Sequence, residues 1–428
     1  MSLIERDKKL VWHPFTQAQT DPAPLPIVRA EGSVLFDENG KSYIDCNSSW
    51  WVNVHGHGHP RIGKAIQDQF KQLDHILFAG STHPSAVDLA ERVIDLLPDG
   101  FSKVFYSDNG STAVEVALKM VLQYWYNQDI DKTRFLALEG AYHGDTFGAM
   151  SIGQRGYFNS PFESLFFDAD YLAFPTEENE AENLEKAERL FKSGEFAAVI
   201  VEPLVQGSSG MKMYSETFLD KLMKVARQYG VLIIFDEVMT GWGRTGKMFA
   251  MNYCQEQPDL VCFSKGLTGG TLPMGMTVTK QFIYNAFLDE SKLKALLHGH
   301  SYTANPIACA AAVESMKMFT EQETIDNIDR ISANHTRFIA SIKGKYKLDD
   351  LRQRGTILAL EISEGKKGSY FSNIREKALN FFLDNGMLLR PLGNVIFLNP
   401  PYCTTDEQME YCYGKIIALI ELQEKGEL

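Results

Sequence analysis

Two charged residues that close apolar segments could act together in covalent chemistry. Asp236 ends the run VLIIFD, and Lys265 ends PDLVCFSK. A poorly solvated lysine at the end of a buried strand favours its neutral amine, a nucleophile that can form an imine. Taken alone, Asp236 could instead be a helix cap or a salt-bridge partner, and Lys265 a surface residue of a turn. The pair predicts a site that bonds a ligand through an amine and holds it through a carboxylate.

A glycine loop precedes a helical pattern in SDNGSTAVEVALKM, and Gly110 and Ser111 stand at the expected start of the helix. Free backbone amides and the helix dipole make such a start suited to an anion. The loop has neither the P-loop spacing nor the dinucleotide G-x-G-x-x-G spacing, so a nucleotide fingerprint is unsupported. A capped helix that binds nothing is an equally open interpretation.

Aromatic residues and an arginine could complete a pocket for a flat or carboxylated ligand. Tyr142 in GAYHGDT could lie against a planar ring, and Asp145 could orient an amine. The neighbours Trp50 and Trp51 could line a pocket. The fork of Arg390, which follows the apolar MLL, matches a carboxylate. A half-buried loop tyrosine, a turn-capping aspartate, core tryptophans and a salt-bridged arginine stay open as alternatives.

Two groups of histidines invite a metal interpretation. His55, His57 and His59 alternate with glycine in VHGHGHP, and His298 and His300 flank another glycine. Alternate residues of an extended chain share a face, so this spacing can build a zinc site. Neither group has an obvious thiolate or carboxylate partner nearby, and the glycines equally suit tight loops in which backbones approach closely. We therefore predict no bound metal.

The elements that would position these residues follow an α/β pattern. Between residues 103 and 278, short apolar runs alternate with polar or helical stretches, which is typical of a mostly parallel, helix-covered sheet. Sites in such sheets lie beyond the carboxyl ends of the strands. Residues 32–46 predict a hairpin, and a second α/β region follows residue 305. We expect a large domain over 61–305 and a small domain over 306–428, with segment 1–60 packed on the small domain.

Size, charge and cysteine usage exclude several classes of protein. The 428 residues carry a net charge of −13, a balance that does not favour binding of nucleic acid, whose recognition needs a basic face. The six cysteines show no C-x-x-C spacing, which favours reduced thiols in a reducing compartment. The first residues lack the apolar region of a signal peptide, and no apolar stretch is long enough to span a bilayer. We therefore expect a cytoplasmic protein without a membrane partner.

Taken together, the motifs resemble the class III (fold-type I) aminotransferases, which depend on pyridoxal phosphate. The resemblance rests on FDEVMTGWGRTGKMF and PDLVCFSKGLTGGTLPMG, with SDNGSTAVEVALKM and AYHGDT upstream in the same order. It implies a large domain with a mostly parallel central sheet and a smaller α/β domain. It also implies pyridoxal 5'-phosphate as the cofactor, small-molecule substrates, and a homodimer with shared active sites.

The resemblance further implies a role for each candidate residue. Lys265 would bond the cofactor and then move the proton, Asp236 would pair with the pyridinium nitrogen, and Tyr142 would pack on the ring and touch the substrate. The other implied roles are Gly110 and Ser111 at the phosphate, His300 and Ser301 at the phosphate of the neighbouring subunit's site, and Trp50, Gly299 and Arg390 at the substrate. Arg390 would bind the substrate carboxylate.

Narrower features resemble one branch of this family, whose members transaminate 8-amino-7-oxononanoate in biotin synthesis. They are WHPFTQ, SSWWVNVHGHGHP, LLRPLGNVIFLNPPY and the chain length. Many members that use S-adenosylmethionine as amino donor have tyrosine where Phe15 and Phe397 stand, and often proline-threonine where His300 and Ser301 stand. The stretch HGHSYT instead resembles members that use lysine, so both donors stay open.

Two rival functions follow from the same residues. One is another class III ω-aminotransferase, acting on ornithine, acetylornithine or 4-aminobutyrate, which a panel of amino acceptors would identify. The other is a non-catalytic or metal-binding protein that keeps the fold. A yellow colour of the purified protein that is lost on borohydride treatment would exclude this second rival.

Overall fold

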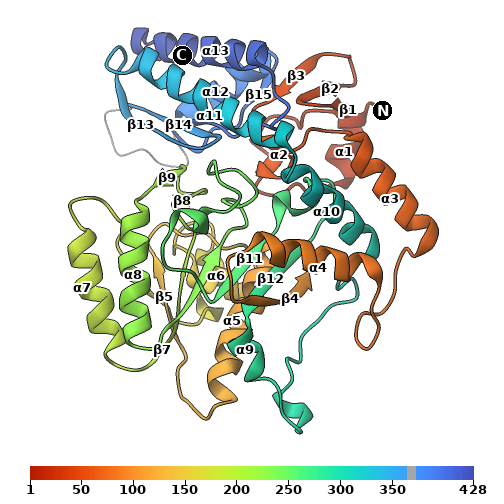
Figure 1. Cartoon of the computed structure of the whole chain (residues 1–428). Helices are drawn as coiled ribbons and strands as arrows, with labels where there is room; N and C mark the ends of the chain where they lie inside the picture. Colours follow the sequence, from red (N-terminus) through yellow and green to blue (C-terminus); the bar gives the residue numbers. More distant parts are fainter. Residues whose placement is uncertain (364–372) are drawn as a thin grey trace.

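A seven-stranded sheet forms the centre of the computed structural model, which describes residues 1–363 and 373–428. The strand order is β4-β12-β11-β10-β7-β5-β6. Strands β11, β10, β7, β5 and β6 pair in parallel, whereas β12 runs antiparallel to both β11 and β4. The bounds are β4 (Phe101–Ser107), β5 (Arg134–Leu138), β6 (Asp170–Leu172), β7 (Phe196–Val201), β10 (Leu232–Asp236), β11 (Leu260–Phe263) and β12 (Gly275–Lys280). The sheet confirms the predicted mostly parallel α/β architecture (Figure 1).

The central strands are continuously apolar because helices cover both faces of the sheet. Every residue of β7 and β10 is buried. Successive side chains of a strand point to opposite faces. Ile234 accordingly belongs to one apolar cluster with residues of α5 (Gly110–Tyr126), and Phe235 belongs to another with residues of α8 (Glu216–Gln228). Burial on both faces explains why these strands read as unbroken apolar runs.

Three helices that begin with proline pack together beside the sheet. They are α3 (Pro60–Gln72), α4 (Pro84–Leu96) and α10 (Pro306–Phe319). Proline suits a first helical turn because its missing N–H would have no intrahelical acceptor there. Helix α10 packs on α3, on α4 and on the short turn η3 (Lys265–Thr268) that follows β11. It therefore supports the segment that carries the candidate lysine.

The two ends of the chain meet in a second region, drawn at the top of Figure 1. Strands β2 and β3 form the predicted hairpin, and β3 also pairs in parallel with β15, so both ends of the chain contribute to one sheet of order β1-β2-β3-β15. Another sheet, β13-β14-β16, and three helices belong to the same region. The bounds are β1 (Ile27–Glu31), β2 (Val34–Asp37), β3 (Ser42–Asp45), β13 (Leu348–Arg354), β14 (Ile357–Ile362), β15 (Met387–Leu388), β16 (Val395–Leu398), α11 (Gln322–Ile342), α12 (Asn373–Asp384) and α13 (Asp406–Lys425). The division into 1–60, 61–305 and 306–428 stays our proposal.

Further, mostly short elements complete the described part of the chain. They are α1 (Leu3–Leu10), α2 (Ser48–Trp51), α6 (Phe147–Ile152), α7 (Glu180–Phe191), α9 (Gln281–Asn285), β8 (Val205–Gln206), β9 (Lys212–Met213), η1 (Ser160–Leu165), η2 (Ala250–Tyr253) and η4 (Lys292–Lys294). Among the residues described, no helix combines the length and the apolar character that crossing a membrane requires.

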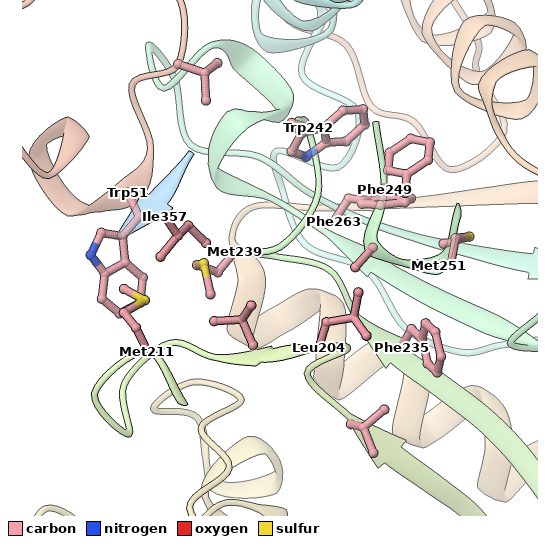
Figure 2. Packing of buried hydrophobic residues seen from close by; sticks show 14 of the residues in the cluster. Trp51, Leu204, Met211, Phe235, Met239, Trp242, Phe249, Met251, Phe263 and Ile357 are labelled. Atoms are coloured by element: carbon pink, nitrogen blue, oxygen red, sulfur yellow. The ribbon is translucent and has the colours of Figure 1, made fainter. Parts of the chain in front are cut away.

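A large apolar cluster extends from the sheet to the candidate site. The rings of Trp242, Phe249 and Phe263 pack with centroids 4.8 to 5.1 Å apart. Figure 2 shows these rings on one side of the cluster and Trp51 on the other, with Met239 between them. Trp51 is only 7% exposed, so its indole is held by the core although it borders a cavity.

Candidate active site

A cavity of about 720 Å³ lies where the strands of the large sheet end. Its lining includes Tyr142, Asp236 and Lys265, together with residues 108–111 and 270–274. These residues follow β4, β5, β10 and β11, whose carboxyl ends lie at one edge of the sheet. The parallel topology thus brings together side chains that are more than 100 residues apart in the sequence, as α/β sheets do at this edge.

Asp236 is held in one orientation at the end of β10. Its Oδ2 lies 2.7 Å from Nδ1 of the buried His143, and its Oδ1 accepts a hydrogen bond of 3.1 Å from the Val238 amide. The carboxylate is only 4% exposed, yet it borders the cavity. A buried carboxylate with two fixed partners presents a negative charge at a defined point of the wall.

Lys265 follows β11, the strand next to β10, and its side chain is half-buried because it borders the cavity. Its backbone has the positive φ of 44°, unusual for a side-chain-bearing residue. Burial lowers the pKa of its amine, while the nearby Asp236 and Glu202 carboxylates act in the opposite direction. The Nζ atom lies 5.3 Å from the centroid of the Trp51 ring. The site therefore favours a more neutral amine than an exposed lysine has.

The start of α5 opens on to the cavity through Gly110 and Ser111. The side chain of Asn109 caps the helix by accepting a 3.0 Å hydrogen bond from the Thr112 amide. A Cβ atom at Gly110 would lie 2.7 Å from Cγ1 of Val238, so only glycine allows this close approach. The first amides of a helix have no intrahelical acceptor, and a 17-residue helix adds its dipole, so this wall suits an anion.

Tyr142 and Glu202 form another wall of the cavity. The Tyr142 amide donates to Glu202 Oε1 at 3.0 Å, and the Gly207 amide donates to Oε2 at the same distance. Burial raises the pKa of Glu202 to about 7. Burial and the neighbouring Asp145 also raise the pKa of the Tyr142 hydroxyl, which therefore stays protonated.

Trp50 and Arg390 lie together but outside the lining of this cavity. The Arg390 guanidinium lies 5.5 Å from the centroid of the Trp50 ring, and the centroid of the Phe15 ring lies 5.6 Å from that of Trp50. Trp50 is 45% exposed. Its neighbour Trp51, to which the sequence assigned no separate role, is the tryptophan that faces Lys265.

Gly299, His300 and Ser301 also lie outside the cavity lining of their own chain. The His300 amide donates to Thr303 Oγ1 at 3.1 Å, and Ser301 is exposed. The segment is therefore placed on the surface, where a second molecule could meet it. Its predicted contact with a neighbouring subunit's phosphate stays a prediction.

Two of the clustered histidines, His55 and His57, have partners other than a metal. His55 Nε2 lies 3.1 Å from Ser315 Oγ, and His57 Nε2 lies 2.8 Å from Asp45 Oδ2. Burial lowers the pKa of His55 to about 3. Over residues 1–363 and 373–428, no group of three or more His, Cys, Asp or Glu side chains is arranged to hold a metal ion.

Two residues of the site were missed by sequence reasoning, His143 and Glu202, whereas Trp51 was named there only as one of a pair with Trp50. Glu202 follows the apolar run AAVIV at the end of β7, and this is the same signal that identified Asp236. His143 lies next to Tyr142 in a loop, and no pattern in the sequence reveals that it contacts Asp236.

The sheet, the amine of Lys265 and the carboxylate of Asp236 define the fold-type I class of pyridoxal-phosphate-dependent transferases. The model of the family "Aminotransferase class-III" matches residues 15–420, and the chain belongs to this family. A relative from Synechococcus elongatus, an adenosylmethionine-8-amino-7-oxononanoate aminotransferase, is 44% identical over 419 residues, which are 96% of this chain and 98% of the relative. A relative of the same name from Staphylococcus aureus is 36% identical over 95% of each chain.

Solved structures agree with this assignment. The adenosylmethionine-8-amino-7-oxononanoate aminotransferase from Methanocaldococcus jannaschii superimposes with a TM-score of 0.93 at 34% identity, over 98% of both chains. The omega transaminase from Pseudomonas jessenii in complex with PMP also gives a TM-score of 0.93, at 26% identity over 100% of both chains. Both matches bear out the predicted fold over nearly the whole length.

The cofactor of this family is pyridoxal 5'-phosphate, and the residues of the cavity fit its chemistry. Lys265 would supply an amine of lowered pKa for the aldehyde. Asp236 would supply a buried carboxylate for a protonated ring nitrogen. Gly110 and Ser111 would supply the start of a long helix for a phosphate.

Proposed function

We propose that this enzyme transfers an amino group to 8-amino-7-oxononanoate and forms 7,8-diaminononanoate for biotin synthesis. The observation that carries the proposal is the meeting of Lys265 and Asp236 at one cavity, in a chain similar over nearly its full length to aminotransferases named for this substrate. The acidic net charge of −13 agrees with small-molecule substrates rather than nucleic acid.

Each wall of the cavity has a part in the reaction that we propose. Pyridoxal phosphate supplies, when bound, an aldehyde that takes up an amino group and a ring that withdraws electrons. Lys265 holds the cofactor and, once released, moves a proton through Nζ, which its lowered pKa favours. Asp236, oriented by His143, keeps the proton on the ring nitrogen. Gly110 and Ser111 hold the phosphate, and Tyr142 packs on the ring.

Substrate binding is assigned to the outer part of the site. Arg390 binds the carboxylate of the keto substrate, because its planar fork matches carboxylate geometry. Trp50 lies against the Arg390 guanidinium and provides an apolar surface for the alkyl chain.

Because one site serves donor and acceptor in turn, we expect ping-pong kinetics, and a sequential pattern in initial-rate plots would contradict this.

The amino donor is S-adenosylmethionine or lysine. Phe15 and Phe397 lack the hydroxyl of the tyrosines found in many adenosylmethionine-using enzymes, and this feature favours lysine. Phe397 is buried, and its ring centroid lies 6.0 Å from that of Trp51. Phe15 lines a second, apolar cavity, and Asp145 lines both this cavity and the first. The names of the relatives favour adenosylmethionine.

We also propose a cytoplasmic homodimer. All six cysteines are free thiols, five of them buried, as expected in a reducing compartment. The dimer is supported by the position of Gly299, His300 and Ser301 outside their own chain's cavity. In a shared site, this segment reaches the phosphate of the partner's cofactor.

One experiment tests substrate and donor together. Purified enzyme with bound cofactor is incubated with 8-amino-7-oxononanoate and either S-adenosylmethionine or lysine, and 7,8-diaminononanoate is detected by mass spectrometry. Product with one donor alone identifies that donor, and the same mixture without acceptor is the control. No product with either donor would overturn the proposed substrate.

A second candidate is an ω-aminotransferase with another acceptor. The similarity to the Pseudomonas jessenii omega transaminase favours it, because that match covers both whole chains. A panel of keto acids and aldehydes, including those of ornithine, acetylornithine and 4-aminobutyrate metabolism, would reveal it as turnover faster than with 8-amino-7-oxononanoate.

A further inference from the structure

The turn that carries the two tryptophans has an unusual backbone. Ser48, Ser49 and Trp51 have φ values of 50°, 59° and 65°. Within α2 the backbone is not helical at Ser49 or Trp50. Positive φ is costly for residues with side chains, so three of them among four consecutive residues persist only where the surroundings hold them.

Asp45 provides the contacts that hold this turn. Its carboxylate is fully buried, and both oxygens accept from the Ser49 amide at 2.8 Å. Oδ1 also accepts from the Asn47 amide at 3.3 Å. His57 Nε2 lies 2.8 Å from Oδ2, and Asn53 Nδ2 lies 3.2 Å from Nδ1 of the same histidine. The carboxylate thus connects the hairpin strand β3 to the strained turn, and its contact with His57 holds the carboxylate itself in place.

The held turn presents its two indoles in different directions. Trp51 faces Lys265 Nζ at 5.3 Å from the ring centroid, and it packs so closely on Gly207 that a Cβ there would lie 2.9 Å from its Cζ3. Trp50 faces the Arg390 guanidinium at 5.5 Å. If the backbone of residues 48–51 relaxed, both rings would move, because the φ and ψ angles of this turn set the directions in which the two indoles point.

We propose that Asp45 is a positioning residue that fixes Trp50 and Trp51 and thereby shapes the aromatic wall for the substrate. This inference rests on the proposed function, which assigns Trp50 and Arg390 to substrate binding. Asp45 does not line the cavity, so it acts through the turn alone. A purely structural role would lower stability and leave substrate affinity unchanged.

The variant Asp45→Asn tests the proposal, because it keeps the size of the side chain and removes one acceptor oxygen. We expect KM for the amino acceptor to rise about tenfold, with cofactor affinity and the visible absorbance of the cofactor-loaded enzyme unchanged. The matched control is Asp259→Asn. Asp259 is another fully buried carboxylate, which accepts from the Ile233 amide and from Arg227 at the amino end of β10, away from the cavity. This control should lower the melting temperature without changing KM.

A second substitution separates positioning from stability. Glycine adopts positive φ without cost, so Ser49→Gly in the Asp45→Asn background should restore most of the lost affinity. Ser49→Gly alone should leave KM within about twofold. An unchanged KM in Asp45→Asn, or no recovery in the double variant, would overturn the proposal. If Asp45→Asn does not fold, His57→Gln replaces it, with an expected rise in KM of about threefold; an unchanged KM there overturns the proposal as well.

The acceptor in these measurements is the one that the unaltered enzyme turns over fastest in the panel. Failure of the unaltered enzyme on 8-amino-7-oxononanoate would therefore contradict the proposed function only. A normal KM of the Asp45→Asn variant for an acceptor that the unaltered enzyme uses well would contradict the positioning role only.

Discussion

At the scale of single residues, the proposed chemistry depends on how Lys265 and Asp236 share one cavity. Burial lowers the pKa of the Lys265 amine, although Asp236 and Glu202 are near enough to oppose that shift. Desolvation is thus the larger effect, and the amine is kept closer to its reactive neutral form. The carboxylates of Asp236 and Glu202 limit how far the pKa of Lys265 falls. The amine can therefore still hold a proton that it takes up.

Lys265→Ala should abolish covalent attachment of the cofactor and lower kcat by about a thousandfold or more, because both the bond and the proton carrier are lost. Borohydride reduction followed by intact-protein mass spectrometry measures the attachment. Lys224→Ala, which removes an exposed lysine of α8, is the control and should behave like the unaltered enzyme. Covalent cofactor in the Lys265→Ala variant would remove Lys265 from this role.

Arg390→Ala should raise KM for the keto acid by about ten- to a hundredfold and change kcat little, because the lost interaction binds substrate and transition state alike. Arg390→Lys keeps the positive charge without the planar fork, so its KM should lie between that of the unaltered enzyme and that of Arg390→Ala. An acceptor analogue without a carboxylate provides the control, since its KM should not respond. An equal loss for both acceptors would mean that Arg390 acts through Trp50 instead of through the carboxylate.

Sequence reasoning found two of the three acidic or basic residues that follow buried strands at the site and missed the third, Glu202, as well as the tertiary contacts between distant residues. Asp236 and Lys265 follow unbroken apolar runs, so their exposure at a sheet edge could be predicted. Trp50 and Trp51 could not be told apart, because the positive φ values of their turn break every regular periodicity. The contact of His143 with Asp236 joins residues 93 positions apart and leaves no local signal.

At the scale of elements, the parallel strands and the hairpin could be predicted, whereas their order could not. Strand β12 is buried like its neighbours, but it runs antiparallel between β11 and β4. Direction depends on the connections between strands, and a buried strand has the same pattern in both directions. The pairing of β15 with β3 joins segments more than 300 residues apart and is equally invisible in the sequence.

Glu237 fixes the segment between β10 and η2 and should give folding a pH dependence. Its buried carboxyl accepts from the amides of Ala250 and Met251 at 2.8 and 2.7 Å, and burial raises its pKa from 4.5 to about 7. Between these two pH values the unfolded chain loses the proton and the folded chain keeps it. The free energy of unfolding should therefore fall as pH rises through this window, by an amount on the order of 2 kcal/mol, and level off above it.

Glu237→Gln removes this titration. The free energy of unfolding, measured by urea denaturation of the cofactor-free variant at several pH values, should therefore fall less steeply with pH between pH 4.5 and 7. A residual slope is expected because burial also raises the pKa of Glu202 to about 7. The control is Glu185→Gln, at an exposed position of α7, which should keep the full slope. An unchanged slope in Glu237→Gln would mean that this carboxyl is ionised in the folded protein.

At the scale of the whole molecule, the proposed shared site predicts that two inactive variants restore each other. Lys265→Ala disables the chain's own cavity. Ser301→Glu places a negative charge on an exposed segment that, in the proposed dimer, repels the phosphate of the partner's site. A mixed dimer has one site with both defects and one with neither. Random pairing of equal amounts makes half of the dimers mixed, so about a quarter of the normal activity should return after refolding together.

Mixing Lys265→Ala with Asp236→Ala is the matched control, because both substitutions affect a cavity built by the chain that carries them. In that mixed dimer each cavity keeps one defect, and no activity should return. Recovery in the first mixture but not in the second would require that residues near Ser301 act across the subunit boundary. Equal activity in the two mixtures would mean that each chain completes its own phosphate site, and the position of Gly299, His300 and Ser301 outside the cavity lining of their own chain would then need another explanation.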